Sequence, residues 1–167
     1  VFIDESSINI GMTRLYGRAK SGERVKDYVP DVRFKRQSIP SLRMNGEMAP
    51  IVFSGTLNGD FFKVYIAYCL APTLSSGDMV VMDNMSSHKV AGVIDPILKK
   101  GATVLFLPPY SPDFNPIEMQ WSKMKTFLRK SKARTLDLLE SAIATALDSV
   151  SITDISNWFK HCGYYKC

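Results

Sequence analysis

The stretch that decides the fold is Pro108-Pro109-Tyr110-Ser111-Pro112-Asp113-Phe114-Asn115-Pro116-Ile117-Glu118. Its prolines predict a turn, which closes a short apolar run over residues 103–107 that is typical of a buried strand. Asn115 and Pro116 then fit the N-cap and the first position of a helix. Glu118 lies in the first turn of that helix. The stretch therefore predicts a strand, a turn and a helix, with a carboxylate at the start of the helix.

Two further apolar strands each end on an aspartate. Asp4 follows the run over residues 1–3, and Asp83 follows the run over residues 79–82. After the second of these strands, Ser87 can cap a helix from His88 to about Lys100, which Gly101 would end. Residues 79–107 are therefore predicted to form a right-handed βαβ unit with parallel strands.

The three carboxylates are expected to meet at one edge of the sheet. In an open α/β sheet, ligands bind beyond the carboxyl ends of the strands. Asp83 lies at such an end, Asp4 reaches the same edge if its strand is parallel to 79–82, and the chain after residue 107 leads from that edge to Glu118. Because three acidic groups in one place repel one another, the arrangement indicates divalent cations. A pair of Mg²⁺ ions held in this way can cleave phosphodiester bonds.

The rest of the chain completes one α/β domain over residues 1–167. Strands over 36–44, interrupted by Pro40, and over 49–54 are predicted to form an antiparallel meander with the first part of the chain. The apolar period predicts helices over 58–70, 117–128, 135–150 and 153–160. We find no internal repeat and no interdomain linker.

Composition and charge limit the class of protein. Of 167 residues, 46% are apolar and 22% charged, which is ordinary for a globular domain, and no apolar run approaches the length of a membrane span. No signal-peptide pattern is present, and three cysteines without paired spacing favour a reducing, intracellular setting. The net charge of +5 is compatible with DNA as a partner, because the basic residues cluster: Arg14, Arg18, Lys20, Arg24 and Lys26; Arg33, Lys35 and Arg36; Lys123, Lys125, Arg129, Lys130, Lys132 and Arg134.

Each candidate residue also has a purely structural interpretation. Asp4 and Asp83 can bond backbone amides in turns, and Asn115 with Glu118 can form a capping box. His88 can contact the scissile phosphate or a water, or can be an ordinary residue of a helix start. Asn84 can orient a ligand. A zinc cluster of His161, Cys162 and Cys167 lacks the usual four-ligand spacing.

One face of the helix after the proline turn carries Glu118, Ser122, Lys125 and Arg129. Lys125 and Arg129 can contact DNA phosphates from this face, or can form a solvated basic surface.

Two motifs resemble the catalytic core of mariner-type DDE transposases and of the related bacterial insertion-sequence transposases. They are Val-Val-Met-Asp-Asn-Met-Ser-Ser-His at 80–88 and Leu-Pro-Pro-Tyr-Ser-Pro-Asp-Phe-Asn-Pro-Ile-Glu at 107–118. The 34 residues between Asp83 and Glu118 match a spacing typical of that superfamily. Phe-Ile-Asp-Glu-Ser at 2–6 is similar to the first catalytic strand. The resemblance covers nearly the whole chain.

The resemblance implies an RNase H-like fold, with a five-stranded mixed sheet flanked by helices. It implies that Asp4, Asp83 and Glu118 hold two Mg²⁺ ions, which Mn²⁺ can replace. The implied activity is hydrolysis at transposon ends, followed by transfer of the 3′-OH into target DNA. Such enzymes act as homodimers inside the cell, at the nucleoid in bacteria, and use N-terminal helix-turn-helix domains that this chain does not contain. The alternatives are a truncated or domesticated DNA-binding module without activity, and an RNase H-like metal nuclease.

Overall fold

A computed structural model describes residues 1–31, 35–46 and 49–164 of the chain. Two residues named above lie outside the described residues: Arg33, from one of the basic clusters, and Cys167, from the zinc cluster that was considered. The strands are β1 (Phe2–Ile3), β2 (Ser6–Asn9), β3 (Lys35–Ile39), β4 (Ser41–Leu42), β5 (Ile51–Ser54), β6 (Met79–Met82) and β7 (Thr103–Phe106). The α-helices are α1 (Gly59–Tyr65), α2 (Asp95–Leu98), α3 (Ile117–Ser131), α4 (Leu136–Asp148) and α5 (Ile152–His161). The shorter helical turns are the π-helix η1 (Ile66–Leu70) and the 3₁₀ turns η2 (Ala71–Thr73), η3 (Ser86–Lys89) and η4 (Pro112–Phe114).

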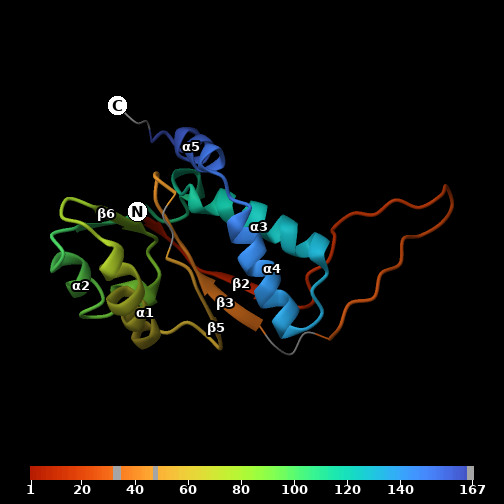
Figure 1. Cartoon of the computed structure of the whole chain (residues 1–167), viewed down its shortest axis with the longest axis horizontal. Helices are drawn as coiled ribbons and strands as arrows, with labels where there is room; N and C mark the ends of the chain where they lie inside the picture. Colours follow the sequence, from red (N-terminus) through yellow and green to blue (C-terminus); the bar gives the residue numbers. More distant parts are fainter. Residues whose placement is uncertain (32–34, 47–48, 165–167) are drawn as a thin grey trace.

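The strands form two hydrogen-bonded sheets, in the orders β4-β1-β6-β7 and β2-β3-β5. The two sheets are connected along the chain, because β1 of one sheet leads into β2 of the other, and β3 leads into β4 (Figure 1). Phe2 lies opposite Leu42 and Ser6 opposite Ser38, so both pairs keep one antiparallel register. The described part of the chain therefore has seven short strands in two sheets rather than the single five-stranded sheet that was predicted, whereas the meander is antiparallel and β1, β6 and β7 are parallel, as predicted.

The interruption between the two sheets falls at Asp4. The shared register places Asp4 opposite Pro40. Because proline has no backbone N–H, it cannot donate a hydrogen bond to the neighbouring strand at this point. The break in the sheet therefore coincides with one of the predicted site residues.

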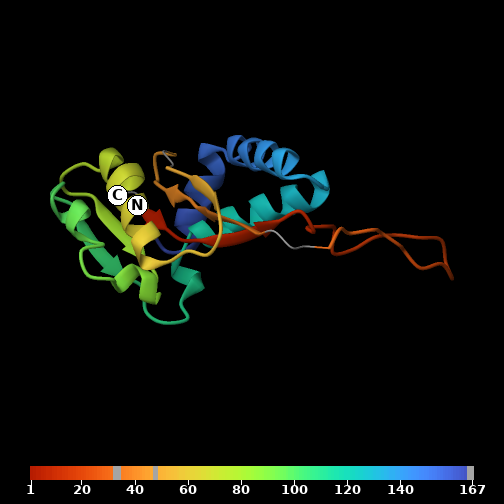
Figure 2. The same cartoon turned by 90° about the horizontal axis from the view of Figure 1, so that it is seen from below.

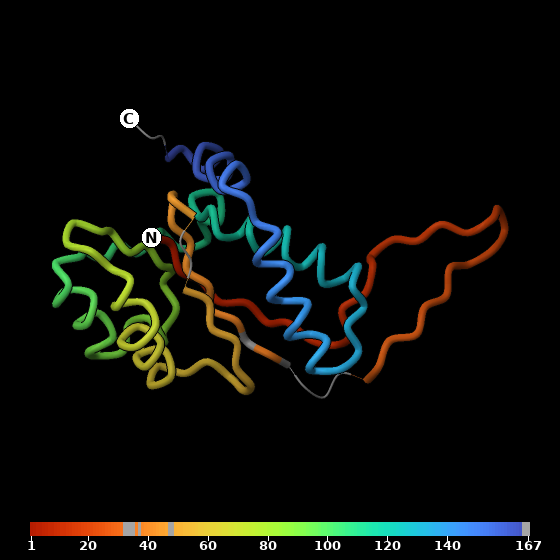
Figure 3. Tube along the Cα trace, in the orientation of Figure 1, coloured from red at the N-terminus to blue at the C-terminus, as the bar shows by residue number. Residues whose placement is uncertain are grey.

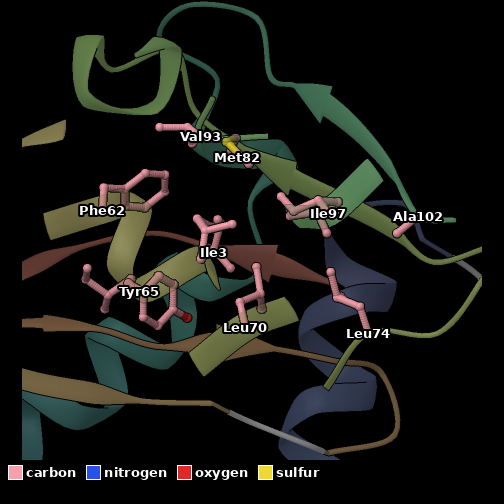
Figure 4. Close-up of a cluster of buried hydrophobic side chains, with 12 residues drawn as sticks. Ile3, Phe62, Tyr65, Leu70, Leu74, Met82, Val93, Ile97 and Ala102 are labelled. Carbon is pink, nitrogen blue, oxygen red and sulfur yellow. The ribbon is translucent and has the colours of Figure 1, made fainter. Parts of the chain in front are cut away.

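Helices cover both faces of the sheet. On one face, Ile3 and Met82 pack with Phe62 and Tyr65 of α1 and Ile97 of α2 (Figure 4). On the other face, Phe2 and Val81 pack with Ile117 of α3 and Phe159 of α5. Further along the same face, Ile8 packs with apolar residues of α3 and α4. Figure 2 gives the view from below, in which α3 runs alongside β2.

The predicted helix over 88–100 is wrong. The segment instead contains the short turn η3, a loop and the single-turn helix α2. Gly92 has a φ of +80°, a left-handed conformation that a right-handed helix cannot accommodate, and Pro96 fits the first turn of α2. The helix predicted to have Asn115 as its N-cap and Pro116 as its first residue begins one residue later, at Ile117, with Pro116 at the N-cap position.

Candidate active site

A cavity of about 580 Å³ lies at the carboxyl ends of β1 and β6. It is lined by Asp4, Asp83, Asn84, Met85, Leu107, Pro108, Pro109, Tyr110, Ser111, Pro112, Asn115 and Glu118. All three predicted carboxylates therefore line the same cavity, together with the proline turn that connects β7 to α3.

The alternation of side chains along the strands explains why the two aspartates share this cavity. Successive side chains of a strand point to opposite faces. Phe2 and Val81 face α3 and α5, whereas Ile3 and Met82 face α1. Asp4 and Asp83 come two residues after Phe2 and Val81, so they return to the face on which α3 packs. There, the first turn of α3 supplies Glu118.

Asp4 is the carboxyl group most affected by its surroundings. Burial raises its pKa to about 7, against the opposing effect of the Glu5 amide, which donates to Asp4 Oδ1 over 2.8 Å. The negative charges of Glu118, Glu5 and Asp83 raise the pKa further. The cavity thus concentrates negative charge, and the Asp4 carboxyl holds its proton to a higher pH than an ordinary aspartate does.

Asp83 is held in its charged form. Burial alone would raise its pKa, but hydrogen bonds from His88 and from the Met85 amide, with the charge of His88, lower the pKa below its usual value. His88 Nδ1 lies 2.8 Å from Asp83 Oδ1, and the Met85 amide donates to the same oxygen over 3.0 Å. The aspartate is therefore oriented before any ligand arrives.

His88 bridges two carboxylates. Its second ring nitrogen, Nε2, lies 3.1 Å from Glu5 Oε2, and its ring packs on Phe62 with a centroid distance of 4.2 Å. Burial would lower the pKa of His88, but the bonds to Asp83 and Glu5 raise it to about 9. The His88 side chain is fully buried. The contact of His88 with a phosphate or a water therefore stays a prediction; in this structure the buried ring bridges Glu5 and Asp83 and positions Asp83.

Asn84 and Glu118 differ in how they are held. The Asn84 side-chain amide donates to the carbonyl oxygen of Leu107 and so ties the end of β6 to the proline turn. Glu118 is exposed at the start of α3. The capping-box alternative for Asn115 and Glu118 is not formed, because the Asn115 side-chain oxygen has no hydrogen-bond partner.

The donor atoms of the cavity fit a hard divalent cation. They are carboxylate and amide oxygens, which Mg²⁺ and Mn²⁺ prefer; the pKa of Asp4 is raised first by burial and then by the nearby negative charges of Glu118, Glu5 and Asp83. Within the described residues, no three His, Cys, Asp or Glu side chains already stand close enough together to hold an ion.

Comparison with known proteins gives the family. A family model described as "DDE superfamily endonuclease" matches residues 1–140. The chain belongs to the DDE superfamily endonucleases. No curated protein matches the endonuclease in sequence.

Solved structures similar to the endonuclease include a Mos1 transposase paired-end complex with the left transposon end, with a TM-score of 0.76 and 15% identity over 95% of this chain and 50% of that one. A mariner Mos1 paired-end complex with Mg gives a TM-score of 0.76 and 15% identity over 97% and 52%. A simian T-cell lymphotropic virus intasome gives 0.53 and 11% over 87% and 46%. The endonuclease spans about half the length of these chains. The likeness supports the RNase H-like fold.

Lys125 and Arg129, which are predicted to contact DNA, do not line the cavity formed by Asp4, Asp83 and Glu118, here called the acid cavity. The Lys125 ammonium stands over the Trp121 ring, 5.8 Å from its centroid. Arg129 lines a separate hollow of about 300 Å³ with Arg14 and Tyr16. Their proposed contacts with DNA therefore concern a surface beside the cavity.

The side chains of Glu5 and Asn115 have roles that were not predicted from the sequence. Glu5 follows Asp4, points to the opposite face of the strand and binds His88. Strand alternation alone could have indicated its direction, but not its partner 83 residues away. Asn115 was assigned only as a helix cap, yet its buried side chain lines the acid cavity. No helix in the described part of the endonuclease is long and apolar enough to cross a membrane.

Proposed function

We propose that this chain is the catalytic domain of a DNA transposase, which hydrolyses phosphodiester bonds at transposon ends and transfers the 3′-OH to target DNA. The single observation that carries the proposal is the placement of Asp4, Asp83 and Glu118, from three separate elements, in one cavity. Membership of the DDE endonuclease family and the fold shared with Mos1 transposase support it.

Asp4, Asp83 and Glu118 would hold Mg²⁺, with Mn²⁺ able to replace it. When bound, the metal supplies a water nucleophile at neutral pH and stabilises the charge on the leaving oxygen. Asp83 offers a charged oxygen whose direction is fixed by His88 and Met85. Asp4 would hold such a cation as its carboxylate, because metal ligands bind in their deprotonated form. The proline turn, held by Asn84, sets the distance between Asp83 and α3.

The partners in this proposal are transposon-end DNA, target DNA and a second copy of the chain. Two ends must be handled together for insertion, so a homodimer is expected when DNA is bound. A DNA substrate also implies action inside the cell, at the nucleoid if the host is bacterial. We expect the metal site to be complete only when DNA is bound, because Mg²⁺ sites of this kind usually include oxygens of the substrate.

Nicking of supercoiled plasmid DNA in Mn²⁺ tests the proposal without knowledge of the end sequence. Asp83→Asn and Glu118→Gln should each lower the nicking rate by at least about 100-fold, because each removes a charged ligand worth several kcal/mol in the transition state. Asp113→Asn is the matched control: Asp113 is exposed in the same turn but does not line the cavity, so its loss should leave the rate unchanged. Full Mn²⁺-dependent nicking by Asp83→Asn would rule out the assignment. DNA binding without nicking by the wild type would favour the inactive DNA-binding module.

A further inference from the structure

Asn115 carries a polar atom that the structure leaves unsatisfied. The residue is 4% exposed, and its side-chain oxygen Oδ1 is buried without a hydrogen-bond partner. Buried polar side chains in folded proteins nearly always have a partner, so an exception indicates a missing ligand, ion or water. Asn115 lines the same cavity as Asp4, Asp83 and Glu118.

The backbone fixes Asn115 at this place. Its amide donates to the Pro112 carbonyl over 2.9 Å, and its carbonyl accepts from the Glu118 amide over 3.1 Å. Pro116 follows directly and restricts the conformation of the preceding residue. The side chain does not cap α3, which begins at Ile117 without a side-chain cap. The buried position of the Asn115 side chain between η4 and α3 is therefore not explained by a helix-capping role.

No neighbouring carboxyl group satisfies the Asn115 oxygen in this structure. An amide oxygen is an acceptor, an ionised carboxylate has no proton to donate, and no hydrogen bond from the Asp4 carboxyl reaches the oxygen. A divalent cation or one of its waters can satisfy it, because amide carbonyl oxygens are regular ligands of hard cations. Ser111 lines the same cavity, but its side chain differs from that of Asn115 because the Ser111 hydroxyl donates a hydrogen bond to the Pro109 carbonyl.

We propose that the side-chain oxygen of Asn115 is a fourth oxygen donor to the divalent cation at the acid cavity, either directly or through one of the cation's waters. This inference rests on the proposed metal-dependent function. It adds to the three carboxylates a neutral ligand that is positioned before the cation binds.

Mn²⁺ binding by calorimetry, with and without a short DNA duplex, tests the inference independently of activity. Asn115→Ala should weaken Mn²⁺ binding about 10-fold, the effect expected when an oriented group of a metal site is removed. Asn115→Asp keeps an oxygen at the same position and should bind Mn²⁺ at least as tightly as the wild type. Ser111→Ala should bind Mn²⁺ like the wild type, because the Ser111 hydroxyl is already paired.

Thermal unfolding supplies a second measurement on the same variants. Without metal, Asn115→Ala should melt no lower than the wild type, because the change removes a buried atom that had no partner. With saturating Mn²⁺ its melting temperature should rise less than that of the wild type, since stabilisation by a ligand follows its affinity. A metal-free Asn115→Ala that melts far below the wild type would show that the side chain serves folding, and would overturn the inference.

The outcomes separate the inference from the proposed function. If the wild type binds Mn²⁺, Asp83→Asn does not, and Asn115→Ala binds like Ser111→Ala, the fourth donor is rejected while the metal site stands. Weaker binding by Asn115→Asp than by the wild type would also reject the donor. If the wild type fails to bind Mn²⁺ even with DNA, both proposals fall.

Discussion

At the scale of single residues, His88 links the core to the acid cavity. Its ring packs on Phe62 of α1, while its two nitrogens reach Glu5 on β1's extension and Asp83 after β6. Because both nitrogens face carboxylates, both must carry protons, which is the charged form of histidine. One buried cation thus offsets the charge of two acids and fixes the direction of the aspartate that lines the cavity.

The bridge predicts how His88 titrates in the metal-free protein. One of its two ring protons should be lost near pH 9, well above the ordinary value of 6.5, in an NMR titration. Because the pKa is higher in the folded state, the bridge's contribution to stability is fully present below about pH 6.5 and lost as the pH rises through about 9. Glu5→Gln removes one charged partner and should move the titration to lower pH. A His88 that titrates below pH 6.5 in the wild type would contradict the doubly protonated bridge.

At the scale of elements, α1 and the chain after β6 approach one another closely at Gly59. A Cβ built at Gly59 would lie 2.3 Å from Val90 Cγ2, which is closer than real atoms come. Glycine is therefore required for the start of α1 to pack against the segment that carries η3 and His88. This contact between α1 and the segment after β6 lies on the face of the sheet opposite to α3, and it supports the cavity from that side.

Gly59→Ala tests this contact between elements. It should lower the free energy of unfolding by about 1–3 kcal/mol, the usual cost of overpacking a filled site. In a Val90→Ala background the same change should cost much less, because the clashing methyl groups are gone. Urea unfolding of the wild type, the two single variants and the double variant measures this coupling. Equal costs of Gly59→Ala in both backgrounds would show that Val90 is not the obstacle.

The strands and helices also show which features of the fold and the site can be predicted from this sequence and which cannot. The aspartates after residues 3 and 82 were assigned to one edge because parallel strands end together, and the structure places both in one cavity. The helix over 88–100, predicted from Ser87 as its cap and Gly101 as its end, was wrong because Gly92 between them adopts a left-handed conformation. The unpaired oxygen of Asn115 could not be foreseen, since it depends on contacts between segments distant in sequence.

At the scale of the whole molecule, residues 14–29 form an arm that projects from the domain beside α3 and α4 (Figure 3). The arm has two extended limbs joined by a turn, in which the Glu23 amide donates to the Lys20 carbonyl. Its base is fastened to the domain: Asp27 accepts hydrogen bonds from Lys132 and Thr13, and Arg134 donates to the carbonyls of Ile10 and Met12. Tyr16 and Tyr28 are almost fully exposed on the arm.

The arm should be the first part of the chain that trypsin cuts, because its exposed basic residues lie on backbone outside any helix or sheet. The expected cleavage is after Arg18, Lys20 or Arg24. The two fragments should stay together with a nearly unchanged melting temperature, because β2 and β3 remain paired on either side of the cut. A variant with these three residues changed to glutamine is the control and should be cut more slowly. First cleavage within α3, at Lys125 or Lys130, would instead mean that the helix opens more readily than the arm, and that the core around Trp121 and Met124 is not the most stable part of the fold.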